Sequence, residues 1–136
     1  MQVQSAQSIN ILTSEDVPAI RQLVRKSSLQ LGFSIVDQTK IVTACSELAR
    51  NLLDYGGGGT AVVEVVQNDA RTGLRLTFED KGPGIPDIAL ALKDGYTTGN
   101  GMGLGLGGSK RLSHEFEIHS APGQGTRVSI VRWKNT

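Results

Sequence analysis

The sequence predicts an α+β fold, a two-layer sandwich in which helices cover one face of a mostly antiparallel sheet. Residues 13–31 and 34–55 carry apolar side chains at helical spacing, and short segments rich in β-branched residues follow them. Glycine, at 17 of 136 residues, gathers at the ends of apolar segments, where it serves turns and close backbone approach. There is no repeat and no linker, so we expect a single domain over residues 1–136.

The N-terminal part is expected to form one short strand and one helix. Residues 9–12, Ile-Asn-Ile-Leu, predict the strand. Thr13 and Asp16 have the spacing of a capping box, which predicts a helix start, and Gly32 is placed to end that helix. Residues 1–8 are rich in Gln and Ser, and termini of that composition usually fray.

A second helix and a hairpin are expected next. Ser34 and Asp37 repeat the capping-box spacing, and the apolar stripe that follows ends at the glycine turn of residues 56–59. Residues 61–67 and 74–79 are rich in apolar and β-branched side chains. The polar segment between them predicts a β-hairpin.

The C-terminal part predicts two helices and a strand pair. Residues 87–93 predict a short helix, and residues 106–114 predict another that begins inside a glycine run. Residues 115–119 and 127–133 predict two strands. The segment that joins them contains Gly-Gln-Gly-Thr at residues 123–126, which in isolation is best interpreted as a hairpin turn.

The overall composition excludes several classes of protein. The net charge of +1 gives no reason to expect a nucleic-acid partner. No apolar run approaches the roughly 20 residues that a membrane-spanning helix needs, and residues 1–12 lack the pattern of a signal peptide. The single Cys45 has no internal disulfide partner, which suits a reducing compartment. We therefore expect a cytoplasmic protein that binds neither nucleic acid nor membrane.

Two polar residues stand out on the second predicted helix. Glu47 and Asn51 are four residues apart, so they project from one face, beside the apolar stripe. Glu47 could take a proton from an attacking hydroxyl or water. Asn51 offers a neutral oxygen of the kind that Mg²⁺ binds. The alternative is that both are solvated surface residues, and the spacing alone favours that alternative.

A second group of candidates follows the strand at residues 74–79. Asp80 is followed by Lys-Gly-Pro-Gly, in which Gly82 and Gly84 allow the backbone to approach a flat group and Pro83 stiffens the turn. A carboxylate at this place could accept a hydrogen bond from an exocyclic amine, which would select adenine over guanine. The alternative is a tight strand-to-helix turn with Asp80 as its cap.

The third group is a glycine run that leads into a predicted helix. Six glycines lie between Gly99 and Gly108, and backbone amides of such a loop at a helix start form a natural phosphate cradle. The run lacks the preceding strand and the later acidic residue of a dinucleotide fingerprint. It also has the order Gly-Ser-Lys where a Walker loop requires Gly-Lys-Ser or Gly-Lys-Thr. The alternative is a glycine loop without a ligand.

In this order and at these intervals, the three groups and residues 123–126 resemble the four nucleotide-contacting boxes of the GHKL ATPases, the superfamily of gyrase, Hsp90, histidine kinases and MutL. Within it, the chain resembles the bacterial anti-sigma and switch serine/threonine kinases, most closely the RsbT type. Residues 43–53 (TACSELARNLL), 79–87 (EDKGPGIPD) and 110–116 (KRLSHEF) carry this resemblance. It implies the GHKL, or Bergerat, form of the two-layer sandwich.

The resemblance also implies a role for each candidate residue. Glu47 would be the general base, Asn51 the magnesium ligand and Asp80 the adenine reader. Contacts with ATP are implied for these residues: Asn51, Asp80, Gly82, Gly84, Ile85, Thr98, Gly99, Gly101, Gly103, Leu104, Gly105, Lys110 and Thr126. One departure concerns the lid: many relatives carry a cation there, whereas residues 95–108 contain no basic residue and Lys110 is the nearest candidate.

The function implied is an ATP- and Mg²⁺-dependent protein serine/threonine kinase, monomeric or weakly dimeric alone. It would phosphorylate a STAS-domain partner in a bacterial partner-switching pathway of the stressosome or anti-sigma type. When released, it would regulate a PPM-type phosphatase. The alternative is a nucleotide-gated binding module with little turnover. The Glu47/Asn51 pair favours the kinase, and the missing lid cation favours the binding module.

Overall fold

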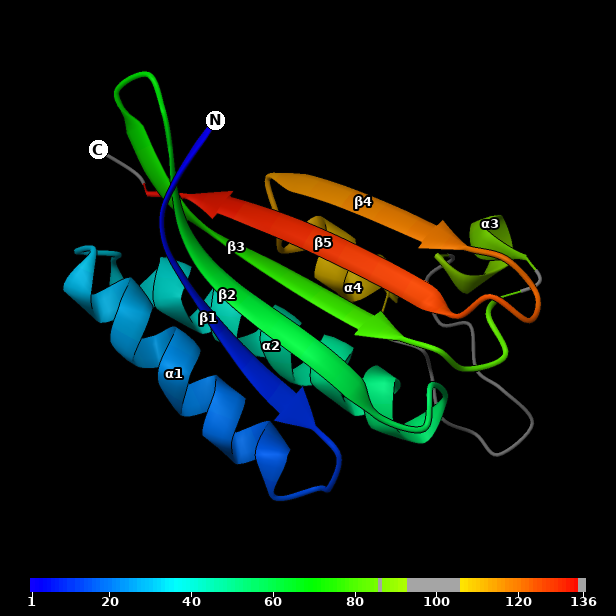
Figure 1. Ribbon diagram of the computed structural model, residues 1–136. Coiled ribbons are helices and arrows are strands. Elements are labelled where there is room, and N and C mark those ends of the chain that lie inside the picture. Colours follow the sequence, from blue (N-terminus) through cyan, green and yellow to red (C-terminus); the bar gives the residue numbers. More distant parts are fainter. Residues whose placement is uncertain (86, 93–105, 135–136) are drawn as a thin grey trace.

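The computed structural model describes residues 1–85, 87–92 and 106–134. Within this part of the chain, antiparallel strands form one sheet in the order β1-β2-β3-β5-β4. Helices α1, α2 and α4 lie on one face of it, which confirms the predicted two-layer α+β fold (Figure 1). In chain order the elements are β1 Gln2–Ile11, α1 Asp16–Gln30, α2 Ile35–Asp54, β2 Gly59–Asn68, β3 Arg71–Asp80, α3 Ile88–Ala91, α4 Leu106–Arg111, β4 Glu115–Ser120 and β5 Thr126–Trp133.

The N-terminal strand is longer than predicted. β1 pairs with β2 from Gln2 to Ile11, so the strand expected at residues 9–12 is only its end. Residues 2–8, whose order the sequence leaves open, therefore belong to this strand, although Gln- and Ser-rich termini usually fray. β1 is an edge strand whose side chains are exposed along most of its length. Backbone hydrogen bonds hold it, and no apolar alternation marks it in the sequence.

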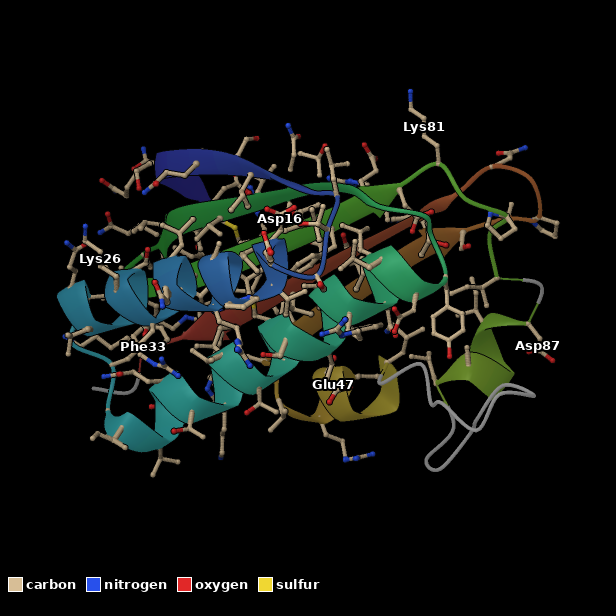
Figure 2. All side chains as sticks on the ribbon, turned by 90° about the horizontal axis from the view of Figure 1, so that it is seen from below. Asp16, Lys26, Phe33, Glu47, Lys81 and Asp87 are labelled. Atoms are coloured by element: carbon tan, nitrogen blue, oxygen red, sulfur yellow. The ribbon has the colours of Figure 1, made fainter. Side chains whose placement is uncertain are left out.

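The two predicted helix starts have different outcomes. α1 begins at Asp16, not at Thr13, and no side-chain bond caps it. The Asp16 carboxylate accepts hydrogen bonds from the backbone N–H groups of Leu12 and Thr13, both at 2.9 Å, and these bonds lower the pKa of Asp16. Figure 2 shows Asp16 in the first turn of α1. The start at Ser34 is confirmed, because its hydroxyl accepts the N–H of Asp37 at 3.1 Å.

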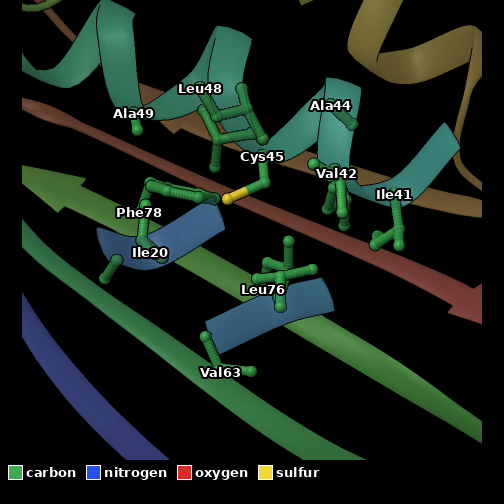
Figure 3. Packing of buried hydrophobic residues seen from close by; sticks show 14 of the residues in the cluster. Ile20, Ile41, Val42, Ala44, Cys45, Leu48, Ala49, Val63, Leu76 and Phe78 are labelled. Carbon is green, nitrogen blue, oxygen red and sulfur yellow. The ribbon is translucent and has the colours of Figure 1, made fainter. Parts of the chain in front are cut away.

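The hydrophobic core lies between the helices and the sheet. Ile20 of α1, Ile41 and Cys45 of α2, and Leu76 of β3 are fully buried in it. Figure 3 shows the Cys45 sulfur pointing toward Phe78 of β3. Burial raises the pKa of the Cys45 thiol to about 12, so it acts as a packing group and not as a nucleophile.

The central hairpin brings the glycine turn next to the end of β3. Gly59 is paired with Asp80 in the β2–β3 register. Both strands extend beyond the predicted ranges of 61–67 and 74–79, because polar residues and glycines at their ends also take ladder positions. A tight turn connects them, with Asp69 in the left-handed region at φ 55°, a conformation that Asp tolerates better than most residues.

The C-terminal elements follow the predicted order, with shorter helices. The helix predicted over residues 87–93 is the four-residue α3, and residue 93 lies outside the described part. The helix predicted over residues 106–114 is α4, and it ends earlier than predicted, at Arg111. There the Leu112 carbonyl accepts a hydrogen bond from Arg132, and the His114 N–H already donates to a β5 carbonyl. The β4–β5 strand pair is confirmed.

Among the described residues, no helix has the length and apolar character needed to cross a membrane.

A buried polar cluster lies at the end of the sheet away from Asp80. Arg132 Nη2 donates to Asp37 Oδ1 at 2.6 Å, and its Nη1 donates to the Leu112 carbonyl at 2.9 Å. The Arg132 and Asp37 side chains are only 8% and 4% exposed. Beside them, His114 Nδ1 accepts the backbone N–H of Trp133 at 2.8 Å. This cluster joins the start of α2 to the end of β5.

His114 is expected to make folding stability depend on pH. Partial desolvation of its imidazole, which is still exposed to solvent, and the nearby charge of Arg132 lower the pKa of His114, against the opposing influence of Asp37. An unfolded histidine titrates near 6.5, so the unfolded chain binds the proton more readily. The free energy of unfolding should therefore be highest above about pH 6.5 and fall as the pH drops through the lower folded pKa. Protonation also removes the acceptor for the Trp133 N–H.

Urea titrations at several pH values between about 5 and 8 would measure this effect. In His114→Gln the decrease below about pH 6.5 should shrink, whereas His119→Gln, at the other histidine of the sequence, serves as the matched control and should retain it. An unchanged decrease in His114→Gln would show that other groups cause it.

Candidate nucleotide site

The C-terminal half of α2 presents Glu47 and Asn51 beside the core. Leu48 and Leu52, which alternate with them on the helix, are buried and fix the rotation of α2 against the sheet. Glu47 is exposed and Asn51 is half-buried. Figure 2 shows Glu47 on the part of α2 that runs beside α4. The structure thus brings a solvent-accessible carboxylate and a partly shielded amide together, one helical turn apart.

The Asn51 side chain has an unused hydrogen-bond donor. Its Nδ2 atom is buried and finds no hydrogen-bond partner among the described residues. A buried polar atom without a partner costs free energy, on the order of 1–3 kcal/mol. Such an atom fits a site that is completed by a polar ligand, and an amide oxygen is a suitable ligand for Mg²⁺.

Asp80 lies at the end of β3 in a turn without bulky side chains. Its Oδ1 accepts the backbone N–H of Gly82 at 2.8 Å. Gly84 has a φ of +80° and lies close to the Ala121 carbonyl, so a side chain there would collide with backbone. The turn-cap alternative is therefore correct for one carboxylate oxygen. Asp80 Oδ2 makes no hydrogen bond within the described part of the chain, so it is an acceptor without a donor.

Ser120 is a site residue that the sequence analysis missed. Its hydroxyl accepts the N–H of Ile85 at 2.8 Å, lies 2.8 Å from Thr126 Oγ1, and donates to the Gly125 carbonyl at 3.0 Å. Thr126 is in turn the register partner of Asp80 on β3. A serine at a strand end gives no signal in sequence for this role. Ser120 joins the predicted contacts Ile85 and Thr126 into one hydrogen-bonded unit.

The surface beside Asp80 is hollowed by about 640 Å³. Asp80, Ile88, Ser120 and Thr126 line this hollow together with other residues of β3, β4 and β5. Glu47 and Asn51 do not line this hollow.

The structure describes only some of the residues that are predicted to contact the phosphates. Lys110 lies in the last turn of α4 with its side chain exposed. The other candidates of the glycine run lie outside the described residues: Thr98, Gly99, Gly101, Gly103, Leu104 and Gly105. Their contacts with phosphate stay predictions.

A family model described as histidine kinase-, DNA gyrase B- and HSP90-like ATPase matches residues 36–136. The serine/threonine-protein kinase RsbT of Bacillus subtilis is 46% identical over 125 residues, which cover 92% of this chain and 94% of that protein. The chain belongs to the RsbT-like serine/threonine kinases of the GHKL ATPase superfamily. The anti-sigma F factor of Thermoanaerobacter sp. (strain X514) is a more distant relative of this RsbT-like kinase, at 27% identity over 98% of this chain and 96% of the relative.

Two solved structures share the fold of the RsbT-like kinase. The RsbU and RsbW domains of Rv1364c from Mycobacterium tuberculosis match with a TM-score of 0.67 and 19% identity, over 98% of this chain and 34% of that one. The SiaB–SiaC complex from Pseudomonas aeruginosa matches with a TM-score of 0.55 and 16% identity, over 96% of this chain and 90% of that one. At these identities the likeness concerns the fold alone.

Proposed function

We propose that this chain binds ATP with Mg²⁺ and transfers the γ-phosphate to a serine or threonine of a STAS-domain protein. The transfer would serve a bacterial partner-switching pathway in the cytoplasm, and the released kinase would regulate a PPM-type phosphatase. The observation that carries this proposal is the similarity to RsbT over nearly the whole chain. The exposed Glu47 beside the half-buried Asn51 supports it, because a pure binding module has no need of a base.

Each candidate would have one task in the reaction. Asp80 Oδ2 would accept a hydrogen bond from the 6-amino group of adenine, a position at which guanine carries a carbonyl. The Asn51 amide oxygen would bind Mg²⁺, which when bound neutralises charge on the phosphate oxygens. Its Nδ2 would gain the acceptor that the described residues do not provide.

Glu47 would take the proton of the attacking hydroxyl. The hydroxyl oxygen forms a bond to the γ-phosphorus, the bond from that phosphorus to the β,γ-bridging oxygen breaks, and ADP leaves with those electrons. The proton passes to the Glu47 carboxylate. Because Glu47 is exposed, a hydroxyl on another protein would have access to it.

A second candidate function is a nucleotide-gated binding module. It is favoured by the lid sequence, since residues 95–108 contain no basic residue and phosphoryl transfer relies on cations near the phosphate. Lys110, the nearest basic residue, would have to serve in their place.

Transfer of label from [γ-³²P]ATP with Mg²⁺ to STAS-domain proteins encoded near this chain would test the proposal. We expect label on a serine or threonine of one such protein, identified by mass spectrometry. Binding of ATP without label on any candidate would contradict the kinase and favour the binding module. Pull-down of a PPM-type phosphatase by the nucleotide-bound chain would then be the next measurement.

A further inference from the structure

The glycine turn after α2 packs directly against the Asp80 side chain. A Cβ atom at position 56 would lie 2.4 Å from both Cγ and Oδ2 of Asp80, and 2.7 Å from its Cβ. All three distances are too short for a real carbon contact, so any side chain at position 56 would displace Asp80 or the turn. Gly56 does not have a positive φ. The requirement for glycine at this position therefore comes from the space that Asp80 occupies, not from the backbone conformation.

Gly82 holds the same carboxylate from another direction. Its N–H donates to Asp80 Oδ1 at 2.8 Å, and a Cβ on Gly82 would lie 2.8 Å from the Cα of Gly56. The loops that contain Gly56 and Gly82 therefore touch through their backbones, with the Asp80 carboxylate against both. One carboxylate oxygen is fixed by a hydrogen bond, and the absence of a side chain on Gly56 leaves room for the rest of the group.

We propose that Gly56 is a positioning residue for recognition of the base. It would not contact the nucleotide. It would act by leaving Asp80 in the orientation in which Oδ2 meets the 6-amino group of adenine. This inference rests on the proposed role of Asp80 as the adenine reader. It adds to adenine recognition a residue on a different loop, the one that follows α2. Gly57, the next residue, has nothing within 4 Å of a Cβ placed on it, so it offers a matched control.

A comparison of the affinities for two nucleotides tests the positioning role of Gly56. We would measure the dissociation constants of ATP and of purine riboside 5′-triphosphate, which lacks the 6-amino group, for the parent, Gly56→Ala, Gly57→Asn and Asp80→Asn. A hydrogen bond to a charged group predicts that the parent prefers ATP by about 10- to 100-fold. In Gly56→Ala this preference should fall below about threefold, whereas the affinity for purine riboside triphosphate, which does not use the bond, should change little. Asn tolerates the positive φ of Gly57, so Gly57→Asn should keep the parental preference.

Asp80→Asn distinguishes failure of this inference from failure of the proposed function. Its amide oxygen would keep the bond from Gly82, so its NH₂ group would face the adenine amine, donor against donor, and the preference for ATP should be lost. If Asp80→Asn keeps the preference, Asp80 is not the adenine reader and the proposed function itself needs revision. If Asp80→Asn loses the preference and a folded Gly56→Ala keeps it, the positioning role of Gly56 is overturned.

A further pair of variants applies if Gly56→Ala does not fold. Asp80→Gly removes every Asp80 side-chain atom that a methyl group at position 56 would meet. The double variant Gly56→Ala/Asp80→Gly should then fold as stably as Asp80→Gly alone, as measured by thermal unfolding. A double variant that stays unfolded while Asp80→Gly folds would overturn the inference, because the glycine requirement would then not come from Asp80.

Discussion

Glu47→Gln is expected to lower the rate of phosphoryl transfer to a protein hydroxyl by about 10²- to 10⁴-fold, the usual contribution of a general base. The amide is nearly isosteric with the carboxylate but does not accept the proton. ATP affinity should stay within about twofold of the parent, because a base that acts on the attacking hydroxyl contributes to the transition state and not to nucleotide binding. Single-turnover transfer and equilibrium ATP binding would be measured on the same preparations.

Asp54→Asn provides the matched control for Glu47→Gln. Asp54 is exposed on the same helix, two turns beyond Glu47, and undergoes the same exchange of carboxylate for amide. We expect parental transfer rates from it. Because Glu47 is exposed, its replacement should also leave thermal stability unchanged. Parental transfer by Glu47→Gln would remove Glu47 from the role of base and leave Asn51 as the α2 residue to test next.

The sequence predicted those elements that bury an apolar face. α2 begins at Ser34 because a local hydrogen bond caps it and a periodic apolar stripe follows, and both signals are visible in the sequence. β1 lacks such a signal, because it is held by backbone pairing with β2 and exposes most of its side chains. The early end of α4 also has no local cause, since Arg132 on a distant strand takes the carbonyl of Leu112.

The same distinction applies to the candidate site. Glu47 and Asn51 could be recognised because helical spacing alone puts them on one face. Ser120 and Gly56 could not, because Ser120 accepts the N–H of Ile85 and Gly56 packs against Asp80, and both partners lie on distant segments of the chain. A glycine that follows a helix is indistinguishable in sequence from an ordinary helix end until the packing of Asp80 against it is known.

Arg132→Met is expected to reduce the free energy of unfolding by about 3–5 kcal/mol, the cost of leaving one member of a buried ion pair without its partner. Asp37 would keep its position in the first turn of α2, with the Ser34 hydroxyl as its remaining side-chain partner. The Arg132 guanidinium is the largest cause of the lowered pKa of Asp37. Urea unfolding at pH 7 would measure the loss.

The pH dependence gives an independent readout of the same ion pair. Since the folded pKa of Asp37 is lowered, the pair contributes its full stabilisation above the unfolded value near 3.9, and this contribution is lost as the pH falls through the folded pKa. In Arg132→Met the free energy of unfolding should therefore decrease less as the pH falls through this range. The double variant Asp37→Asn/Arg132→Met should recover part of the stability, because no buried charge is left unpaired.

The pair between Arg127 and Glu79 supplies the control for Arg132→Met. Its charged atoms are 3.8 Å apart, and the two side chains are 50% and 62% exposed. Solvent screening makes such a pair weak, so Arg127→Gln should change stability by less than about 0.5 kcal/mol. If Arg132→Met were equally mild, the end of β5 would not be anchored to the start of α2 through Asp37. Arg132→Met should also leave the affinity for ATP unchanged, because the Arg132–Asp37 pair lies at the end of the sheet away from Asp80.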